Sequence, residues 1–194
     1  DAFFTQALTK TEKQAKSMKR MIEDFLIISR LEEAKLQLNP ETFELHLLLQ
    51  ELIQDFQLIH GHHDLHFSHD GQVYLHADRS KIAHVMVNLI GNAIKYGPKK
   101  SKITIGYRTQ GSEVKIYVED KGIGISEADQ KHLFERFYRV QTEKTKHITG
   151  FGIGLYLASE ILRYHNSDIC VQSSIGKGST FYFMLPIDEH RDEG

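Results

Sequence analysis

The chain has 194 residues, of which 40% are hydrophobic, enough for one compact core of the usual ~100–150 residues and a smaller appendage. Its 24 basic and 26 acidic residues give a formal net charge of −2, which argues against nucleic acid or an anionic membrane surface as a partner. No apolar stretch reaches the ~20 residues of a spanning helix and no signal peptide is seen, so we expect a cytoplasmic piece of a longer protein, whose own membrane anchoring stays open. The single cysteine, Cys170, lies in an apolar run and is predicted to be a buried thiol.

Residues 2–35 contain neither glycine nor proline, which predicts a long amino-terminal helix of about 50 Å. One face of this helix carries apolar residues at alternating spacings of three and four, namely Met18, Met21, Phe25 and Ile28, with Ile22 beside them. Packing against its own domain would bury this face. A helix of this length outruns one small domain, however, so we expect it to associate with another helix.

Asn39-Pro40 ends the helical segment, because proline disfavours helical geometry in the residue before it. We therefore divide the chain into a helix at 1–38, a domain at 42–188 and a tail at 189–194. Within the domain, the patterns predict helices at 44–60, 80–96 and 155–164, and strands at 64–67, 72–76, 102–108, 113–119, 168–172 and 179–185. Most neighbouring strands are joined by tight turns, so we expect an α+β fold with a mixed sheet covered by helices on one face.

The predicted helix at 80–96 carries two amides and an ammonium on one stripe. Asn88, Asn92 and Lys95 fall within an arc of about 60°, whereas the opposite side is apolar. Asparagine is a mediocre helix former, so two of them one turn apart require an explanation. Magnesium or phosphate oxygens would provide one. A solvated helix face is the alternative, and it is favoured when the stripe is taken alone.

Two glycine clusters have the form of ligand-binding turns. Asp120 ends a strand and is followed by Gly122 and Gly124, so the turn can press against a flat ligand while the carboxylate accepts from an adenine amino group. An ordinary hairpin turn explains this cluster equally well. The run Gly150–Leu155 precedes a helix, whose backbone amides attract phosphate oxygens. Its glycine spacing, the polar loop before it and the absence of a later acidic residue argue against a dinucleotide-binding fingerprint.

Two further segments complete the pattern. Residues 134–139 mix aromatic side chains with arginines just ahead of the polar stretch 140–149, and loops of that length are often lids. Arg139 is placed to neutralise charge on a transferred phosphoryl group, with a salt-bridged surface arginine as the alternative. Gly176-Lys177-Gly178 is by itself only a hairpin turn.

In this order, the motifs resemble the N, G1, F, G2 and terminal glycine boxes of sensor histidine kinases. The matching residues are Asn88-to-Asn92 with Lys95-Tyr96, Asp120-x-Gly122-x-Gly124, Phe134-x-Arg136-Phe137, Gly150-x-Gly152-x-Gly154 and Gly176-x-Gly178-Ser179-Thr180-Phe181. Each motif is weak evidence, but five in register are strong. The run Phe25–Lys35 looks like the second helix of the family's dimerisation hairpin. The resemblance implies a two-layer α/β sandwich, the GHKL or Bergerat ATPase fold, with a flexible ATP lid at 141–149.

The resemblance also implies roles for individual residues. Asn92 would bind Mg²⁺ with Asn88 nearby, Lys95 would reach phosphate, and Arg139 would contact the γ-phosphate, which makes these four the expected catalytic set. Tyr96 would lie against the adenine, whose amino group would donate to Asp120. The other residues expected at the nucleotide are Gly122, Gly124, Ile125, Phe137, Tyr138, Gly150, Phe151, Gly152, Ile153, Gly154, Leu155 and Thr180.

The implied activity is transfer of the γ-phosphoryl group of ATP, with Mg²⁺, to a histidine of the dimerisation domain and then to an aspartate of a response regulator. The parent protein would be a homodimer through the first helix. The family's phosphoacceptor histidine should precede that helix and is missing, so this chain is expected to bind ATP or ADP without phosphorylating itself. The alternatives are a GHKL-type ATPase, which needs a glutamate where Asn88 stands, and a non-catalytic nucleotide-binding scaffold.

A cluster of histidines follows the predicted helix at 44–60, at His60, His62, His63, His66 and His69. Metal ligands must converge, whereas the alternation around His66 turns its side chain outward. A solvated turn and an edge strand are therefore favoured over a metal site.

Overall fold

The computed structural model describes residues 2–33, 36–59, 63–143, 145–146 and 150–188. The chain divides into two compact units, residues 1–37 and 38–194. The first is built on α1 (Ala2–Glu32), which confirms the predicted long helix. Its side chains Met18, Ile22 and Phe25 are 63%, 60% and 49% exposed. None of the described helices has both the length and the apolar composition needed to cross a bilayer.

The second unit holds all of the described strands. In chain order its elements are β1 (Glu41–Glu44), α2 (Leu45–Ile59), β2 (Asp64–Ser68), β3 (Tyr74–Ala77), α3 (Arg79–Tyr96), β4 (Lys102–Gln110), β5 (Glu113–Asp120), α4 (Glu127–Gln130), α5 (Gly154–Tyr164), β6 (Cys170–Ser174) and β7 (Gly178–Pro186). Five strands form one sheet in the order β2-β4-β5-β7-β6, while β1 and β3 form a separate two-stranded ribbon. The β2 and β4 strands are parallel and the other neighbours are antiparallel.

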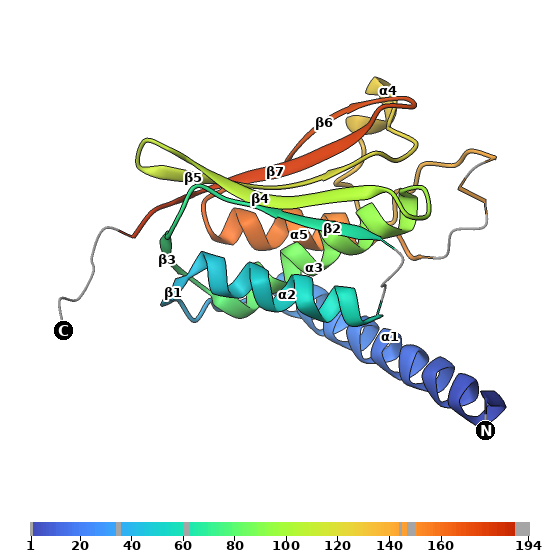
Figure 1. Cartoon of the computed structure of the whole chain (residues 1–194). Helices are drawn as coiled ribbons and strands as arrows, with labels where there is room; N and C mark the ends of the chain where they lie inside the picture. The colour runs from blue at the N-terminus through green and yellow to red at the C-terminus, as the bar shows by residue number, and fades with distance from the viewer. Residues whose placement is uncertain (1, 34–35, 60–62, 144, 147–149, 189–194) are drawn as a thin grey trace. The chain divides into compact units, whose positions relative to one another are not determined.

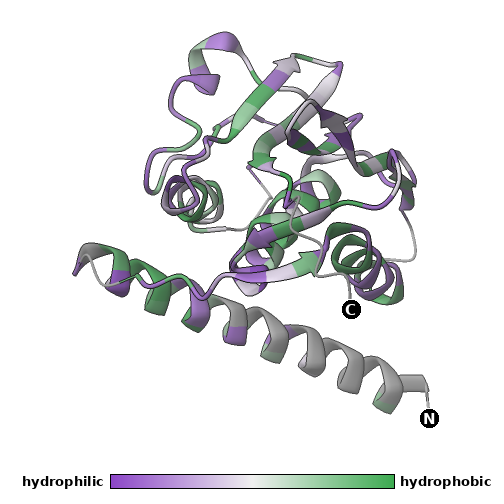
Figure 2. Ribbon diagram, turned by 90° about the vertical axis from the view of Figure 1, so that its left-hand side faces the viewer, coloured by the Kyte–Doolittle hydropathy of each residue, from purple (hydrophilic) through white to green (hydrophobic). Residues whose placement is uncertain are grey.

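Within this unit, α2, α3 and α5 lie together on one side of the five-stranded sheet (Figure 1). Strand residues alternate between the two faces, as a pleated strand requires, so that Ile103, Ile105 and Tyr107 of β4 are fully buried. Hydrophobic segments are concentrated in the helices and strands that form the interior, and much of the loop surface is hydrophilic (Figure 2). The predicted α+β class and two-layer sandwich with a mixed sheet are therefore confirmed.

The structure of this unit differs from the predictions in three respects. Residues 41–44 form a strand that was not predicted, and the following helix begins at Leu45 rather than at residue 44. Cys170 is exposed rather than buried. Its strand β6 is an edge strand, and Cys170 faces the side of the sheet opposite to the buried Phe181, beside its cross-strand partner Tyr182. The apolar neighbours of Cys170 in sequence therefore do not share its environment, because adjacent strand residues face opposite sides.

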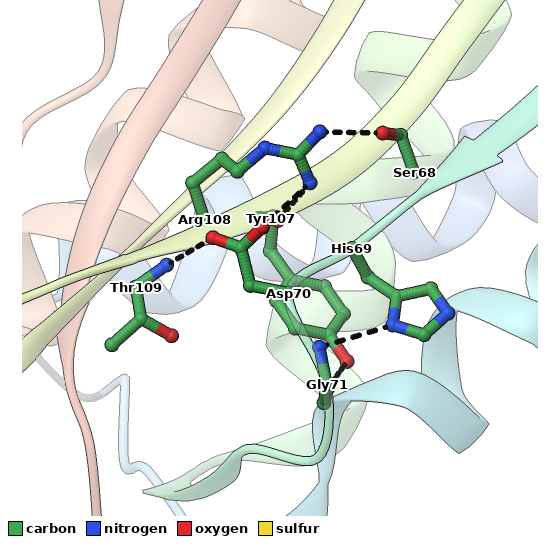
Figure 3. Close-up of polar contacts among 7 residues, drawn as sticks. All are labelled: Ser68, His69, Asp70, Gly71, Tyr107, Arg108 and Thr109. Atoms are coloured by element: carbon green, nitrogen blue, oxygen red, sulfur yellow. Dashed lines mark hydrogen bonds and ion pairs between the residues drawn. The ribbon is translucent and has the colours of Figure 1, made fainter.

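The loop after β2 is fastened to β4 by a polar network (Figure 3). Asp70 pairs with Arg108 at 3.1 Å and accepts a hydrogen bond from the backbone N–H of Thr109 at 3.1 Å. The buried hydroxyl of Tyr107 donates to the carbonyl of Gly71. Burial raises the pKa of Tyr107 to about 12, helped by nearby carboxylates, so the phenol stays protonated and remains a donor. These contacts hold the parallel edge strand β2 in register.

The histidine cluster lies on and around this edge. His66 is exposed on β2, which confirms the predicted edge strand. His69 packs edge-on against His46 of α2, with 4.6 Å between ring centroids. His60 and His62 lie outside the described residues. Among the part of the chain that the structure describes, no three His, Cys, Asp or Glu side chains are grouped to hold a metal ion.

Candidate functional site

Helix α3 carries the predicted polar stripe, and its ends are well defined. Asp78 caps the amino end through the N–H of Lys81, and the N–H of Gly97 closes the carboxyl end on the carbonyl of Ala93 at 2.9 Å. Asn88 is only 4% exposed. The simple solvated face that the stripe suggested by itself therefore does not apply to Asn88, because a buried amide needs polar surroundings.

The glycine loop before α5 approaches this stripe closely. A Cβ atom built on Gly154 would lie 2.9 Å from Asn88 Oδ1, and one built on Gly150 would lie 2.6 Å from Lys95 Nζ. Gly152 has a φ of +72°, and its carbonyl accepts a hydrogen bond from Phe137 at 3.0 Å. The loop therefore presents its backbone to the amide and ammonium groups of α3, and side chains other than hydrogen would occupy that space.

Asp120 stands at the end of β5 and is buried. Its Oδ1 accepts a hydrogen bond from the N–H of Gly122 at 2.7 Å. Burial raises the pKa of the Asp120 carboxyl above its ordinary value, and the hydrogen bonds from Gly122 and Ser179 offset only part of that rise. A Cβ on Gly122 would come within 2.6 Å of Asp120 Oδ1 and 2.7 Å of the Tyr96 carbonyl. The turn is thus packed between β5 and the end of α3.

Tyr96 and Arg139 lie near each other at this end of α3. Burial raises the pKa of the Tyr96 hydroxyl, and the positive charge of Arg139 opposes part of the rise. The Lys95 ammonium is 5.2 Å from the centre of the Tyr96 ring. The Lys95 ammonium therefore lies beside a half-buried aromatic ring, an arrangement suited to a planar base followed by phosphate groups.

The hairpin between β6 and β7 closes the site from the other side. A Cβ on Gly178 would lie 2.0 Å from the carbonyl of Asp120, so only glycine fits at this position. The cross-strand partner of Asp120 is Ser179, which is buried on the same face. Thr180, predicted to lie near the base, pairs with Glu119 and faces the opposite side of the sheet, where it lines a shallow polar hollow. Ser179 therefore shares the face of the sheet on which Asp120 lies, whereas Thr180 does not.

The aromatic segment after α4 reaches the site only in part. Phe137 is 58% exposed with a φ of +66°, and the Arg136 guanidinium stacks on its ring at 4.8 Å. The hydroxyl of Tyr138 donates to Asp129 of α4 at 2.7 Å, away from α3. Phe151 is 61% exposed. The structure brings the backbone of this segment to Gly152 but leaves these aromatic rings at the surface.

The remaining predicted residues have framework positions. Ile153 is buried ahead of α5, and Leu155 lies half-buried in its first turn. The N–H of Ile125 donates to Ser173 Oγ at 2.9 Å, and that hydroxyl lies 2.9 Å from Ser179 Oγ. Sequence reasoning missed both serines, although a serine directly after the terminal glycine box was a visible signal. The predicted lid at 141–149 falls partly on residues 144 and 147–149, which lie outside the described residues.

The fold and the site together define an ATP-binding domain. A sequence profile described as histidine kinase-, DNA gyrase B-, and HSP90-like ATPase matches residues 77–189. This match covers more than half of the chain and includes all five of the motifs described above. The chain therefore belongs to the histidine kinase-, DNA gyrase B- and HSP90-like ATPase family, as the motifs predicted.

Sensor histidine kinases are among the proteins similar to this chain. The chain is 32% identical over 190 residues to the sensor histidine kinase WalK of Bacillus subtilis, covering 96% of this chain and 31% of WalK. The nucleotide-free catalytic domain of histidine kinase ThkA is 26% identical, with a TM-score of 0.67 over 76% of this chain and 95% of that domain. The structure of full-length ShkA in complex with AMPPNP shares the fold, with a TM-score of 0.77 and 21% identity over 90% of this chain and 37% of ShkA. The chain thus resembles the ATP-binding catalytic domains of sensor histidine kinases, and it spans about a third to a half of the length of the curated relatives it matches.

Proposed function

We propose that this domain binds ATP together with Mg²⁺ and, in the full-length protein, delivers the γ-phosphoryl group to a histidine on the dimerisation helices. From that histidine the group passes to an aspartate of a response-regulator receiver domain. The observation that carries the proposal is the convergence on one site of a buried carboxylate, Asp120, and the polar stripe of α3, with glycines at each close approach. The sensor histidine kinases among the relatives support the same assignment.

The adenine end of the site is formed by the end of β5. Asp120 accepts from the adenine amino group, since an ionised carboxylate is acceptor-only and that amino group is a donor. Ser179 lies beside Asp120 and joins it at the base, in place of Thr180. Tyr96 lies against the ring, and Gly122 keeps open the space in which a side chain would collide with Asp120 Oδ1.

The phosphate end is formed by α3 and the glycine loop. The carboxamide oxygens of Asn92 and Asn88 are hard oxygen donors of the kind that Mg²⁺ prefers, so the residues present fit that ion. Lys95 binds phosphate oxygens, and the backbone amides around Gly152 and Gly154 contact the polyphosphate at the start of α5. ATP supplies the transferable phosphoryl group when bound. The chain's own residues position it and neutralise its charge, with Arg139 directed at the γ-phosphate.

Helix α1 supports homodimerisation of the full-length protein. Met18, Ile22 and Phe25 follow one another at spacings of four and three residues and are exposed. An apolar stripe with this spacing is typical of helices that pair with other helices. We therefore place α1 in the dimerisation hairpin, with the kinase domain acting in the cytoplasm.

Two measurements test the proposal. Calorimetric titration of the isolated chain with Mg-ATP is expected to show binding, which Lys95→Met weakens and the matched surface variant Lys99→Met leaves unchanged. In the full-length protein, Asn92→Ala is expected to abolish acid-labile phosphohistidine. Labelling that survives in the Asn92 variant would refute the assignment, and steady ATP hydrolysis by the isolated chain would favour an ATPase, although Asn88 stands where such enzymes need a glutamate.

A further inference from the structure

A set of hydrogen bonds at the start of α3 joins three segments that are far apart in the sequence. Asp78 Oδ2 accepts from the backbone N–H of Asn39 at 3.0 Å. Asp78 Oδ1 accepts from the hydroxyl of Ser80 at 2.7 Å and from the N–H of Lys81 at 3.1 Å. The N–H of Asp78 donates to His165 Nε2 at 3.2 Å. Asp78 therefore connects the segment that enters the domain with the amino end of α3 and the carboxyl end of α5.

The protonation of both side chains follows from these partners. Burial alone would raise the pKa of Asp78, but the hydrogen bonds from Ser80, Asn39 and Lys81 hold it below its ordinary value. The carboxylate is therefore ionised and accepts all three bonds. His165 Nδ1 lies 2.8 Å from the carbonyl of Ile161, which can only accept, so Nδ1 carries the proton and Nε2 is the acceptor for Asp78.

The two helices joined at Asp78 carry the nucleotide site further along. Asn88 lies about 15 Å along α3 from Asp78, at ~1.5 Å per residue. Gly154, at the other end of α5 from His165, is the residue whose Cβ would lie 2.9 Å from Asn88 Oδ1. Helices α3 and α5 are thus joined by a hydrogen bond at one place and approach each other closely at a second. The distance between the two helices near Asn88 and Gly154 sets the space available to a ligand between the polar stripe and the glycine loop.

We propose that Asp78 is a positioning residue for nucleotide binding, which ties the spacing of α3 and α5 to the position of the entering segment at Asn39. The proposal rests on the proposed function, because it presupposes nucleotide binding between these helices. Coupling of this kind is reciprocal. Nucleotide therefore strengthens the Asn39–Asp78 hydrogen bond, and loss of that bond weakens nucleotide binding. Asn39 follows α1 in the chain, so a displacement of the segment before Asn39 would change nucleotide affinity through this hydrogen bond.

Matched variants separate this role from helix capping. Asp78→Asn retains an oxygen that caps α3 about as well as aspartate, but turns an amide N–H₂ toward the N–H of Asn39. Asn39→Pro removes the backbone N–H that donates to Asp78, and residue 39 has no positive φ that would exclude proline. Asn39→Ala keeps this N–H. By calorimetry, Asp78→Asn and Asn39→Pro are expected to bind Mg-ADP severalfold more weakly than wild type, because each variant removes a hydrogen bond that is stronger in the nucleotide-bound state. Asn39→Ala is expected to bind normally.

Two further measurements distinguish a role in nucleotide binding from a contribution to stability alone. Mg-ADP is expected to slow amide hydrogen exchange at Asn39 in wild type but not in Asp78→Asn. His165→Gln, whose amide oxygen can accept from the N–H of Asp78, is expected to keep wild-type affinity, whereas His165→Leu loses it severalfold. Variants that unfold at a lower temperature yet bind Mg-ADP as wild type does would overturn the proposal and leave the proposed function intact. A folded wild-type chain that does not bind Mg-ADP would overturn both.

Discussion

Replacing Gly124 by alanine is expected to destabilise the domain more than the same change at Gly111. The two glycines have nearly the same backbone conformation, with φ of +69° and +64°. Each variant therefore pays a similar cost of about 1–2 kcal/mol for placing a Cβ in the left-handed region. The surroundings differ, because a Cβ on Gly124 would lie 1.9 Å from the Ser174 carbonyl, while a Cβ on Gly111 meets nothing within 4 Å.

The steric clash adds to the cost at Gly124 alone. Forcing an extra group into a packed site costs about 1–3 kcal/mol, so Gly124→Ala should unfold roughly 2–12 °C below Gly111→Ala. The turn that carries Asp120 must also shift, and calorimetry should show weaker Mg-ATP binding for the Gly124 variant only. Equal melting temperatures and equal affinities for the two variants would show that the turn adapts freely. The close approach to β6 would then have no role in shaping the site.

Three further outcomes are expected. The raised pKa of Asp120 means that the folded state holds the carboxyl proton more tightly than the unfolded state, so the stability from this group is present in acid and is lost as the pH rises above 3.8. In urea titrations between about pH 4 and neutrality, Asp120→Asn should therefore have a higher free energy of unfolding than wild type. The same variant should lose nucleotide affinity. Tyr107→Phe leaves the Gly71 carbonyl without its side-chain donor and should lower the free energy of unfolding by about 1–2 kcal/mol, measured in urea. Thr145→Val removes a buried hydroxyl that accepts from the N–H of Thr142 at 2.8 Å, and should speed proteolytic cleavage between residues 140 and 149 without changing the melting temperature of the sheet.

The glycines at close approaches between segments were the most predictable residues of the site. Gly122, Gly124, Gly154 and Gly178 each lie where a Cβ would collide with a neighbouring group. A glycine needed for such a reason appears in the sequence directly, since no other residue can replace it. The motifs in register were therefore sufficient to indicate the family, while the mixed sheet was predicted from the tight turns between strands.

Other features depended on which face of a strand a residue occupies. The phase of alternation in β7 follows from the pairing of Ser179 with Asp120, and pairing is a tertiary property that local sequence does not contain. A shift of one residue exchanges the two faces, so the motif alone does not say whether Ser179 or Thr180 lies on the face of Asp120. The same reason explains Cys170, whose apolar neighbours in the chain lie on the other side of an edge strand. The Asp78 junction was also invisible, because its partners lie 39 and 87 residues away.

The site concentrates features that cost stability until a ligand binds. Asp120 is buried with a raised pKa, and Phe137 holds a left-handed backbone while its ring is exposed. The hydrogen bonds that Asp120 accepts within the chain do not fully offset its burial. An adenine amino group supplies a further donor to that carboxylate, and phosphate oxygens supply acceptors for Lys95. At neutral pH and at the same nucleotide concentration, nucleotide should therefore raise the free energy of unfolding by more in wild type than in Asp120→Asn. For wild type, a rise of about 2.7 kcal/mol is expected at a nucleotide concentration of a hundred times its Kd. Equal stabilisation of the two proteins would mean that the buried carboxylate is a feature of the fold alone, and that the base is recognised elsewhere.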